Sequence, residues 1–212
     1  MKSIPLFAAL LLNAAIAALE LFVLGKLTRK EELFKYYTYL ANLIAWIAGV
    51  VFVISAACCL LQAAALPLWV KGIRFCASFM LCTTLFVYFF VLRPMDKSQN
   101  TITAEDFTGI SPEFANFVLH VLCPALSAVS FVFLERQPVL TDPAWTLRAA
   151  IPTILYWTVY LILTAAKLWE DPYGFSRPNK SRSAAGAVMG LLVPAVSVGL
   201  DFLLWWLNTL NF

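Results

Sequence analysis

Thr38 and His120 are two residues of this chain whose types together suit nucleophilic catalysis. A neutral imidazole can take the proton of a hydroxyl, and the oxygen then attacks an acyl carbon. Amide side chains such as those of Asn42 and Asn116 can donate hydrogen bonds to the oxyanion that forms. A nearby glutamate or tyrosine can orient the imidazole. These residue types make a candidate site for acyl chemistry, without specifying a substrate.

Motifs and composition exclude several other chemistries. The chain has no G-x-S-x-G nucleophile elbow, no H-E-x-x-H zinc motif, and no P-loop or dinucleotide fingerprint. Its single histidine rules out a bis-His haem, and its five cysteines lie in apolar runs without a C-x-x-C pair. The net charge of +3 is too weak and dispersed for a nucleic-acid surface. We therefore expect no cofactor, no metal and no nucleic-acid partner.

The composition is that of a membrane protein. Hydrophobic residues make up 62% of the chain and charged residues only 13%, whereas a soluble domain carries about 25% charged residues. Six stretches match the roughly 20 apolar residues that a spanning helix needs. The sequence thus predicts an all-α polytopic membrane protein, with residues 1–212 as one integral membrane domain. The expected helices cover residues 4–25, 36–61, 69–92, 114–134, 145–169 and 184–207.

The start of the fourth expected helix carries a clear local signal. Ser111 can cap the helix, Pro112 suits its first position, and Glu113 favours its positive end. The pair Asp142-Pro143 repeats this signal before the fifth helix.

Charge distribution predicts an orientation. Six spans put both termini on one side, and the loops of the other side hold ten of the 15 Lys and Arg residues. Positive residues favour the cytoplasm. We therefore expect both termini outside and the three richer loops inside.

This topology brings polar residues from five helices to a similar depth. Thr38 and Asn42 lie four residues apart on one helix face, and so do Asn116 and His120. Polar groups in a membrane core are costly and functional by default. Asp201 lies toward the opposite face. The residues expected in the shared half are Glu20, Thr38, Asn42, Tyr88, Asn116, His120, Tyr160 and Thr164.

Pro124 follows His120 by four residues. Proline has no N–H and cannot donate to the carbonyl of His120. We expect a local kink or a freed carbonyl at this point of the helix.

Each of these polar residues also has a purely structural interpretation. A membrane threonine often bonds to its own preceding turn, and an asparagine often joins two helices. Gly186 and Gly190 are spaced as in a close-packing helix face. Two alternatives to an enzyme therefore remain: a small-solute or proton-coupled transporter using Glu20, His120 and Asp201, and a non-catalytic membrane scaffold with the two glycines as its contact.

Three segments resemble a known family. Residues 34–43 (FKYYTYLANL) resemble the second-helix motif of the androgen-induced-gene-type membrane hydrolases, and residues 119–124 (LHVLCP) resemble their histidine motif. Pro152, Tyr156 and Tyr160, followed by residues 169–175 (WEDPYGF), resemble their fifth-helix and loop pattern, although relatives often have proline where this chain has Gly174.

The resemblance covers most of the chain and implies a six-helix fold of a family with bacterial members. The animal members hydrolyse fatty acid esters of hydroxy fatty acids with a threonine and a histidine. Carried over to this sequence, the resemblance makes Thr38 the nucleophile and His120 the base. It also implies a lipid ester drawn from the bilayer as substrate. Asn42, Asn116, Glu20, Tyr88 and Tyr160 would then contact the substrate.

Overall fold

A computed structural model of the chain describes residues 3–92, 106–135, 142–169 and 183–210. Of residues 3, 91–92 and 183–192 it describes the backbone alone. In the described part every regular element is helical, and a single isolated bridge joins Leu27 to Phe107. The expected all-α fold of a polytopic membrane protein is confirmed.

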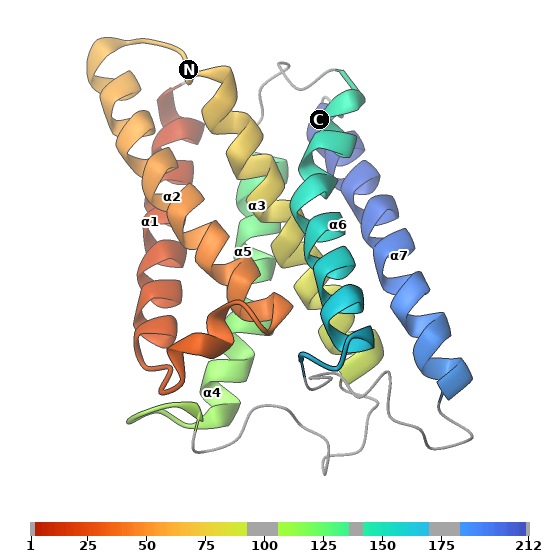
Figure 1. Cartoon of the computed structure of the whole chain (residues 1–212). Coiled ribbons are helices and arrows are strands. Elements are labelled where there is room, and N and C mark those ends of the chain that lie inside the picture. The colour runs from red at the N-terminus through yellow and green to blue at the C-terminus, as the bar shows by residue number, and fades with distance from the viewer. Residues whose placement is uncertain (1–2, 93–105, 136–141, 170–182, 211–212) are drawn as a thin grey trace.

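Long helices form an elongated bundle (Figure 1). Five stretches of the described residues are long and apolar enough to cross a membrane, and they match the first five expected spans. The sixth expected span forms a helix of 27 residues. The elements are α1 (Ser3–Gly25), η1 (Lys30–Leu33), α2 (Tyr37–Gln62), α3 (Leu68–Val87), η2 (Tyr88–Leu92), α4 (Pro112–Phe117), η5 (Val118–Leu122), α5 (Cys123–Val129), η6 (Ser130–Leu134), α6 (Ala144–Ala165) and α7 (Ser183–Thr209).

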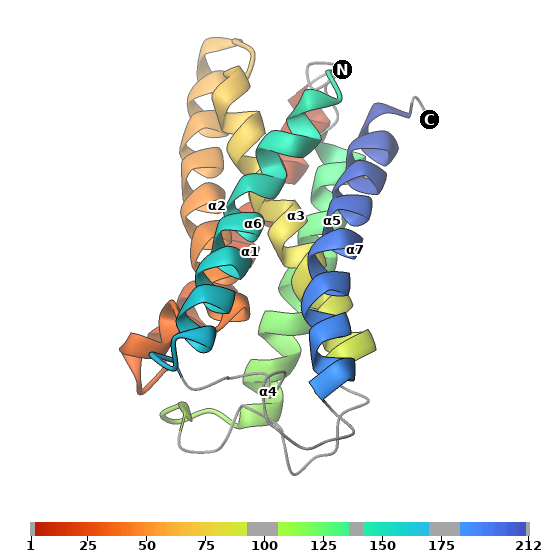
Figure 2. The ribbon, with the colours of Figure 1, turned by 45° about the vertical axis from the view of Figure 1, so that its right-hand side comes forward.

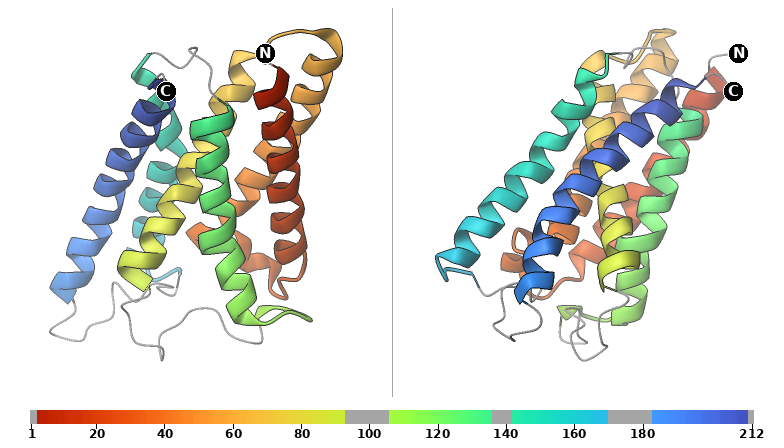
Figure 3. Two further views of the ribbon diagram at one scale, coloured as in Figure 1. Left: turned by 180° about the vertical axis from the view of Figure 1, so that it is seen from behind. Right: turned by 90° about the vertical axis from the view of Figure 1, so that its right-hand side faces the viewer.

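Helix α3 occupies the middle of the bundle. It packs against α2, α5, α6 and α7, while α1 packs against α2 and α5 (Figures 1 and 2). The view from behind shows the helix formed by α4, η5, α5 and η6 lying between α1 and α3 (Figure 3). Helix α1 begins and α7 ends at the same end of the bundle. This arrangement fits an even number of crossings.

The fourth spanning helix is not a regular α-helix. It begins as predicted, with the Ser111 side chain accepting a hydrogen bond from the Phe114 amide at 3.2 Å. It then contains two π-helical segments, η5 and η6. A π-helical turn inside an α-helix is rare and occurs frequently at functional sites. His120 lies in the middle of η5.

Helix α6 ends at Ala165, four residues before the end expected from the sequence. Lys167 adopts a left-handed conformation with φ of 57°. The Leu168 amide then donates back to the Leu163 carbonyl at 2.9 Å. This chain reversal satisfies terminal carbonyls as a Schellman-type cap does. The residues that follow α6 are still mostly apolar. Hydropathy alone therefore predicts a helix that is longer than the one in the structure.

Two loop segments are joined beside the start of α2. The Thr28 amide donates to the Asp106 carbonyl at 2.8 Å, and the Thr108 amide donates to the Lys26 carbonyl at 2.9 Å. The ring of Phe107 packs edge-on against Tyr39, with centroids 6.2 Å apart. These contacts hold the ends of α1, α2 and α4 together at one end of the bundle.

Candidate active site

The Thr38 hydroxyl and the His120 imidazole are in direct contact. Thr38 Oγ1 lies 3.0 Å from His120 Nε2. Thr38 is the second residue of α2, and His120 is the third residue of η5. Both side chains are buried, with exposed fractions of 8% and 3%. The depth argument from the sequence placed them at one level, and the two helices bring them within hydrogen-bond distance.

The hydrogen bond made by the other ring nitrogen of His120, Nδ1, determines which of the two nitrogens can act as a base. Nδ1 lies 3.2 Å from the carbonyl oxygen of Asn116, one turn earlier. A carbonyl only accepts hydrogen bonds, so Nδ1 carries the proton and donates it. In a neutral imidazole Nε2 then holds a lone pair and accepts from the Thr38 hydroxyl. The pair has the arrangement of a nucleophile beside its general base.

The π-helical turn leaves one backbone carbonyl without its usual donor. The Cys123 amide donates to Val118, five residues back, and not to Leu119. The next residue that could donate to Leu119 is Pro124, which has no N–H. The Leu119 carbonyl is therefore left without a donor from Cys123 or Pro124, next to the His120 carbonyl, to which Pro124 cannot donate either.

Asn42 supplies the missing hydrogen bond. Its Nδ2 donates to the Leu119 carbonyl at 3.1 Å and to the carbonyl of Thr38 at 2.8 Å. The residue is fully buried, and its Oδ1 has no hydrogen-bond partner in the described part of the chain. The expectation that the Asn42 amide serves an oxyanion does not fit this arrangement, since both of its hydrogens are engaged by backbone carbonyls.

The two expected tyrosines lie in different surroundings. The Tyr88 ring packs against the His120 imidazole, with centroids 5.2 Å apart. Tyr160 belongs to an aromatic cluster, stacking on Tyr156 at 6.3 Å and meeting Trp157 edge-on at 5.3 Å. The Tyr156 hydroxyl donates to the Lys35 carbonyl at 2.7 Å. This cluster holds α6 against the segment that leads into Thr38.

Two buried carboxyl groups have no hydrogen-bond partner among the described residues. They belong to Glu20 in α1 and Asp201 in α7, and both residues are 0% exposed. The hydroxyl of Thr164 is likewise without a partner there. The loop from residue 170 to 175 and the side-chain surroundings of Gly186 and Gly190 lie outside the described residues.

Because a backbone carbonyl orients His120, the side chain of Asn116 is not needed for that orientation. We expect Asn116→Ala to leave the imidazole nitrogen signals unchanged in a ¹⁵N NMR spectrum. His120 is the chain's only histidine, so a preparation without tag histidines gives signals from this ring alone. A shifted Nδ1 signal in the variant would contradict the carbonyl's role.

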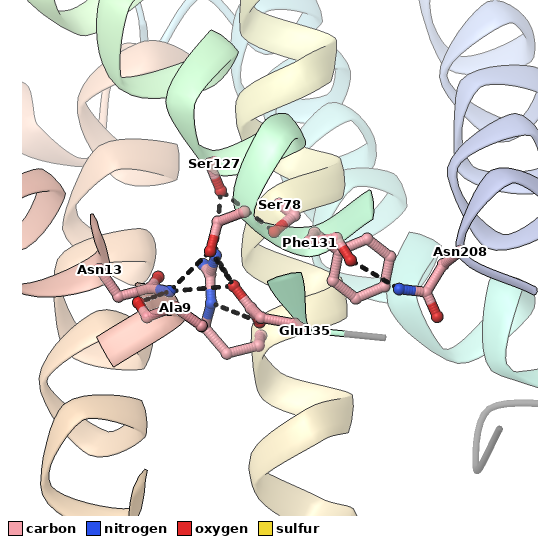
Figure 4. Close-up of polar contacts among 9 residues, drawn as sticks. Ala9, Asn13, Ser78, Ser127, Phe131, Glu135 and Asn208 are labelled. Atoms are coloured by element: carbon pink, nitrogen blue, oxygen red, sulfur yellow. Dashed lines mark hydrogen bonds and ion pairs between the residues drawn. The ribbon is translucent and has the colours of Figure 1, made fainter. Parts of the chain in front are cut away.

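A second buried polar cluster, which the sequence analysis missed, joins α1, α3 and the end of η6 (Figure 4). Arg74 forms an ion pair with Glu135, with Nη2 2.9 Å from Oε1. Nδ2 of Asn13 donates to Glu135 and to Ser130, each at 2.9 Å. Arg74 also donates to Ser127 at 3.3 Å. The signal in the sequence was Arg74 itself, a charged residue six positions after the start of the third helix.

This ion pair predicts a strong effect on stability. Glu135→Gln leaves the buried Arg74 charge without its partner, and breaking a buried pair typically costs about 3–5 kcal/mol. We expect a clear fall in melting temperature in detergent. The matched control is Glu32→Gln, which removes the 3.6 Å contact to the exposed Arg29 and should cost at most about 1 kcal/mol. Equal melting temperatures for the two variants would refute the structural role of the pair.

Comparisons of the chain with protein-family models, curated proteins and solved structures find no match. Among the described residues no group of three or more His, Cys, Asp or Glu side chains is placed to hold a metal ion.

Proposed function

We propose that this protein is an intramembrane hydrolase of lipid esters, with Thr38 as nucleophile and His120 as base. The observation that carries the proposal is the 3.0 Å contact between Thr38 Oγ1 and a His120 Nε2 whose partner nitrogen is held by a carbonyl. The resemblance of residues 34–43 and 119–124 to a family of membrane hydrolases points to the same pair. It also suggests fatty acid esters of hydroxy fatty acids, or similar esters, as substrates.

In the proposed reaction the Thr38 hydroxyl gives its proton to Nε2 while Oγ1 attacks the ester carbonyl carbon. The tetrahedral intermediate collapses, and the imidazolium returns the proton to the leaving alcohol. The acyl group is then bound to Thr38 as an ester. His120 takes a proton from a water molecule, whose oxygen attacks the acyl carbon. The acid is released as the proton returns to Thr38 Oγ1.

The remaining expected site residues receive distinct proposed roles. With the Asn42 amide engaged, the Asn116 amide and the Tyr88 phenol are the proposed donors to the oxyanion. Glu20 and Tyr160 are proposed to line the path of the acyl chains. The substrate would enter from the bilayer. The proposed setting is a bacterial inner membrane with both termini outside, since the opposite end carries more Lys and Arg.

A covalent probe tests the proposal. A fluorophosphonate of the kind used for serine hydrolases should label the wild-type protein in nanodiscs, and mass spectrometry should locate the adduct on Thr38. Thr83→Val is the matched control, because Thr83 is also a buried membrane threonine and its hydroxyl has no hydrogen-bond partner in the described residues. Labelling should persist in that control and vanish in Thr38→Val. Labelling that survives Thr38→Val would overturn the assignment.

A proton-coupled carrier is the second candidate, favoured by one observation. Glu20 and Asp201 are buried carboxyl groups without a hydrogen-bond partner among the described residues. Intramembrane groups that can titrate are a feature of proton relays. Proton flux into vesicles that is lost in Glu20→Gln and Asp201→Asn but unchanged in Thr38→Val would favour the carrier. The opposite pattern would favour the hydrolase.

A further inference from the structure

The side chain of Asn42 connects the two backbone turns that carry Thr38 and His120. In one direction its amide holds the carbonyl of Thr38, on its own helix. In the other it holds the carbonyl of Leu119, the residue directly before His120. The Asn42 side chain thus connects the helical turn that carries Thr38 to the turn that carries His120.

We propose that Asn42 and Pro124 together form a positioning device for the catalytic pair, an inference that rests on the proposed function. Pro124 keeps the Leu119 carbonyl free of a backbone donor, since the Cys123 amide has moved to Val118. The free carbonyl then takes its hydrogen bond from α2, through Asn42. The π-helical turn is thereby tied, at the residue before His120, to the helix of Thr38, and this tie sets the distance from Oγ1 to Nε2.

The burial of Asn42 supports this role over a contact with substrate. Its side chain is fully buried, and both hydrogens of its amide point to carbonyl oxygens at 2.8 and 3.1 Å. A buried carbonyl left without a donor is costly. Loss of the amide would therefore let the turn that carries His120 relax. A displacement of about 1 Å between reacting groups can cost about 100-fold in rate.

The chain offers a matched control in Asn208. Its Nδ2 also joins two helices through a backbone carbonyl, that of Phe131, at 2.6 Å. Asn208 lies in α7, and Figure 4 shows its bond to Phe131 of η6, whereas Thr38 belongs to α2. Asn208→Ala removes the same type of interhelical bond without touching the turn of His120.

The first test reads the geometry without any enzyme assay. In ¹⁵N NMR of His120, Thr38→Val should shift the Nε2 signal, because the nitrogen loses its hydrogen bond. Asn42→Ala should shift that signal in the same direction, and Asn208→Ala should leave it unchanged. If Asn42→Ala proves unstable, Asn42→Leu fills the space without a donor and should give the same shift. An Nε2 signal unchanged in the folded Asn42 variants would overturn the proposal.

The second test measures ester hydrolysis and combines substitutions of Asn42 and Pro124. Asn42→Ala should lower kcat at least about tenfold with KM changed less than about twofold, the pattern of a misplaced catalytic group. In a Pro124→Ala background residue 124 regains an N–H, so the same substitution should cost less. An equal loss in both backgrounds would overturn the role of Pro124. If Thr38→Val and wild type hydrolyse esters alike, the proposed function fails, while the NMR result still decides the positioning of His120.

Discussion

Thr38→Val should abolish ester hydrolysis while leaving the protein folded. Valine has nearly the shape of threonine, but a methyl group replaces the hydroxyl and cannot form an acyl-enzyme. Thr38→Ser keeps a hydroxyl but loses the methyl group that restricts its rotamer, so partial activity is expected. The measurement is hydrolysis of a lipid ester in nanodiscs, paired with a melting curve on the same samples.

The stability side of this prediction follows from the strength of single polar contacts in membranes. Such a contact contributes about 0.6 kcal/mol on average. Losing the 3.0 Å bond to His120 should therefore shift the melting temperature little. Thr83→Val again serves as control and should match wild type in activity. Wild-type turnover by Thr38→Val would remove the threonine from the mechanism while leaving the fold and topology intact.

His120→Ala should reduce hydrolysis by about 10²–10⁴-fold, the usual contribution of a general base. Covalent labelling of Thr38 should fall in parallel, because the hydroxyl loses the group that accepts its proton. Full activity in this variant would contradict the role of His120. The control is Thr83→Val, which removes a buried membrane hydroxyl that has no hydrogen-bond partner in the described residues and leaves the Thr38–His120 pair in place.

The pH profile gives a second measurement of the same role. Nε2 accepts the Thr38 proton only while the imidazole is neutral, so activity should be lost as acid protonates the ring and retained at neutral and mildly alkaline pH. Titration of the single histidine can be followed by ¹⁵N NMR. The midpoint of that titration should coincide with the acid limb of kcat/KM. A flat activity profile across the NMR midpoint would rule out His120 as the base.

Hydropathy was sufficient to find the spanning helices, because each must be about 20 apolar residues long to cross the bilayer. The depth of Thr38 and His120 followed from helix order alone, since alternate helices enter from the same side. Local signals also worked where the chemistry is local, as at the Ser111 cap. The end of α6 was misplaced because the left-handed turn at Lys167 interrupts an apolar run that hydropathy reads as continuous.

The finer features of the site depend on contacts between helices. Pro124 indicated a carbonyl without a donor at His120, but the π-helical hydrogen bond from Cys123 to Val118, which also leaves the Leu119 carbonyl without a donor, could not be predicted from the proline alone. That Asn42 reaches the Leu119 carbonyl depends on how α2 and η5 face each other, and no spacing within either segment encodes that. The Arg74–Glu135 pair was missed for the same reason, since its partners come from separate spans.

The position of Thr38 at the second residue of α2, beside the loops joined by Leu27 and Phe107, has a consequence for kinetics. If Thr38 and His120 act as proposed, a pair so close to one end of the bundle would meet its ester within a single leaflet. For the proposed hydrolase, velocity would then follow the mole fraction of ester in that leaflet, and diluting the substrate with inert lipid would slow turnover at constant bulk concentration. The newly formed carboxylate would emerge at headgroup level, with its alkyl tail still among the acyl chains.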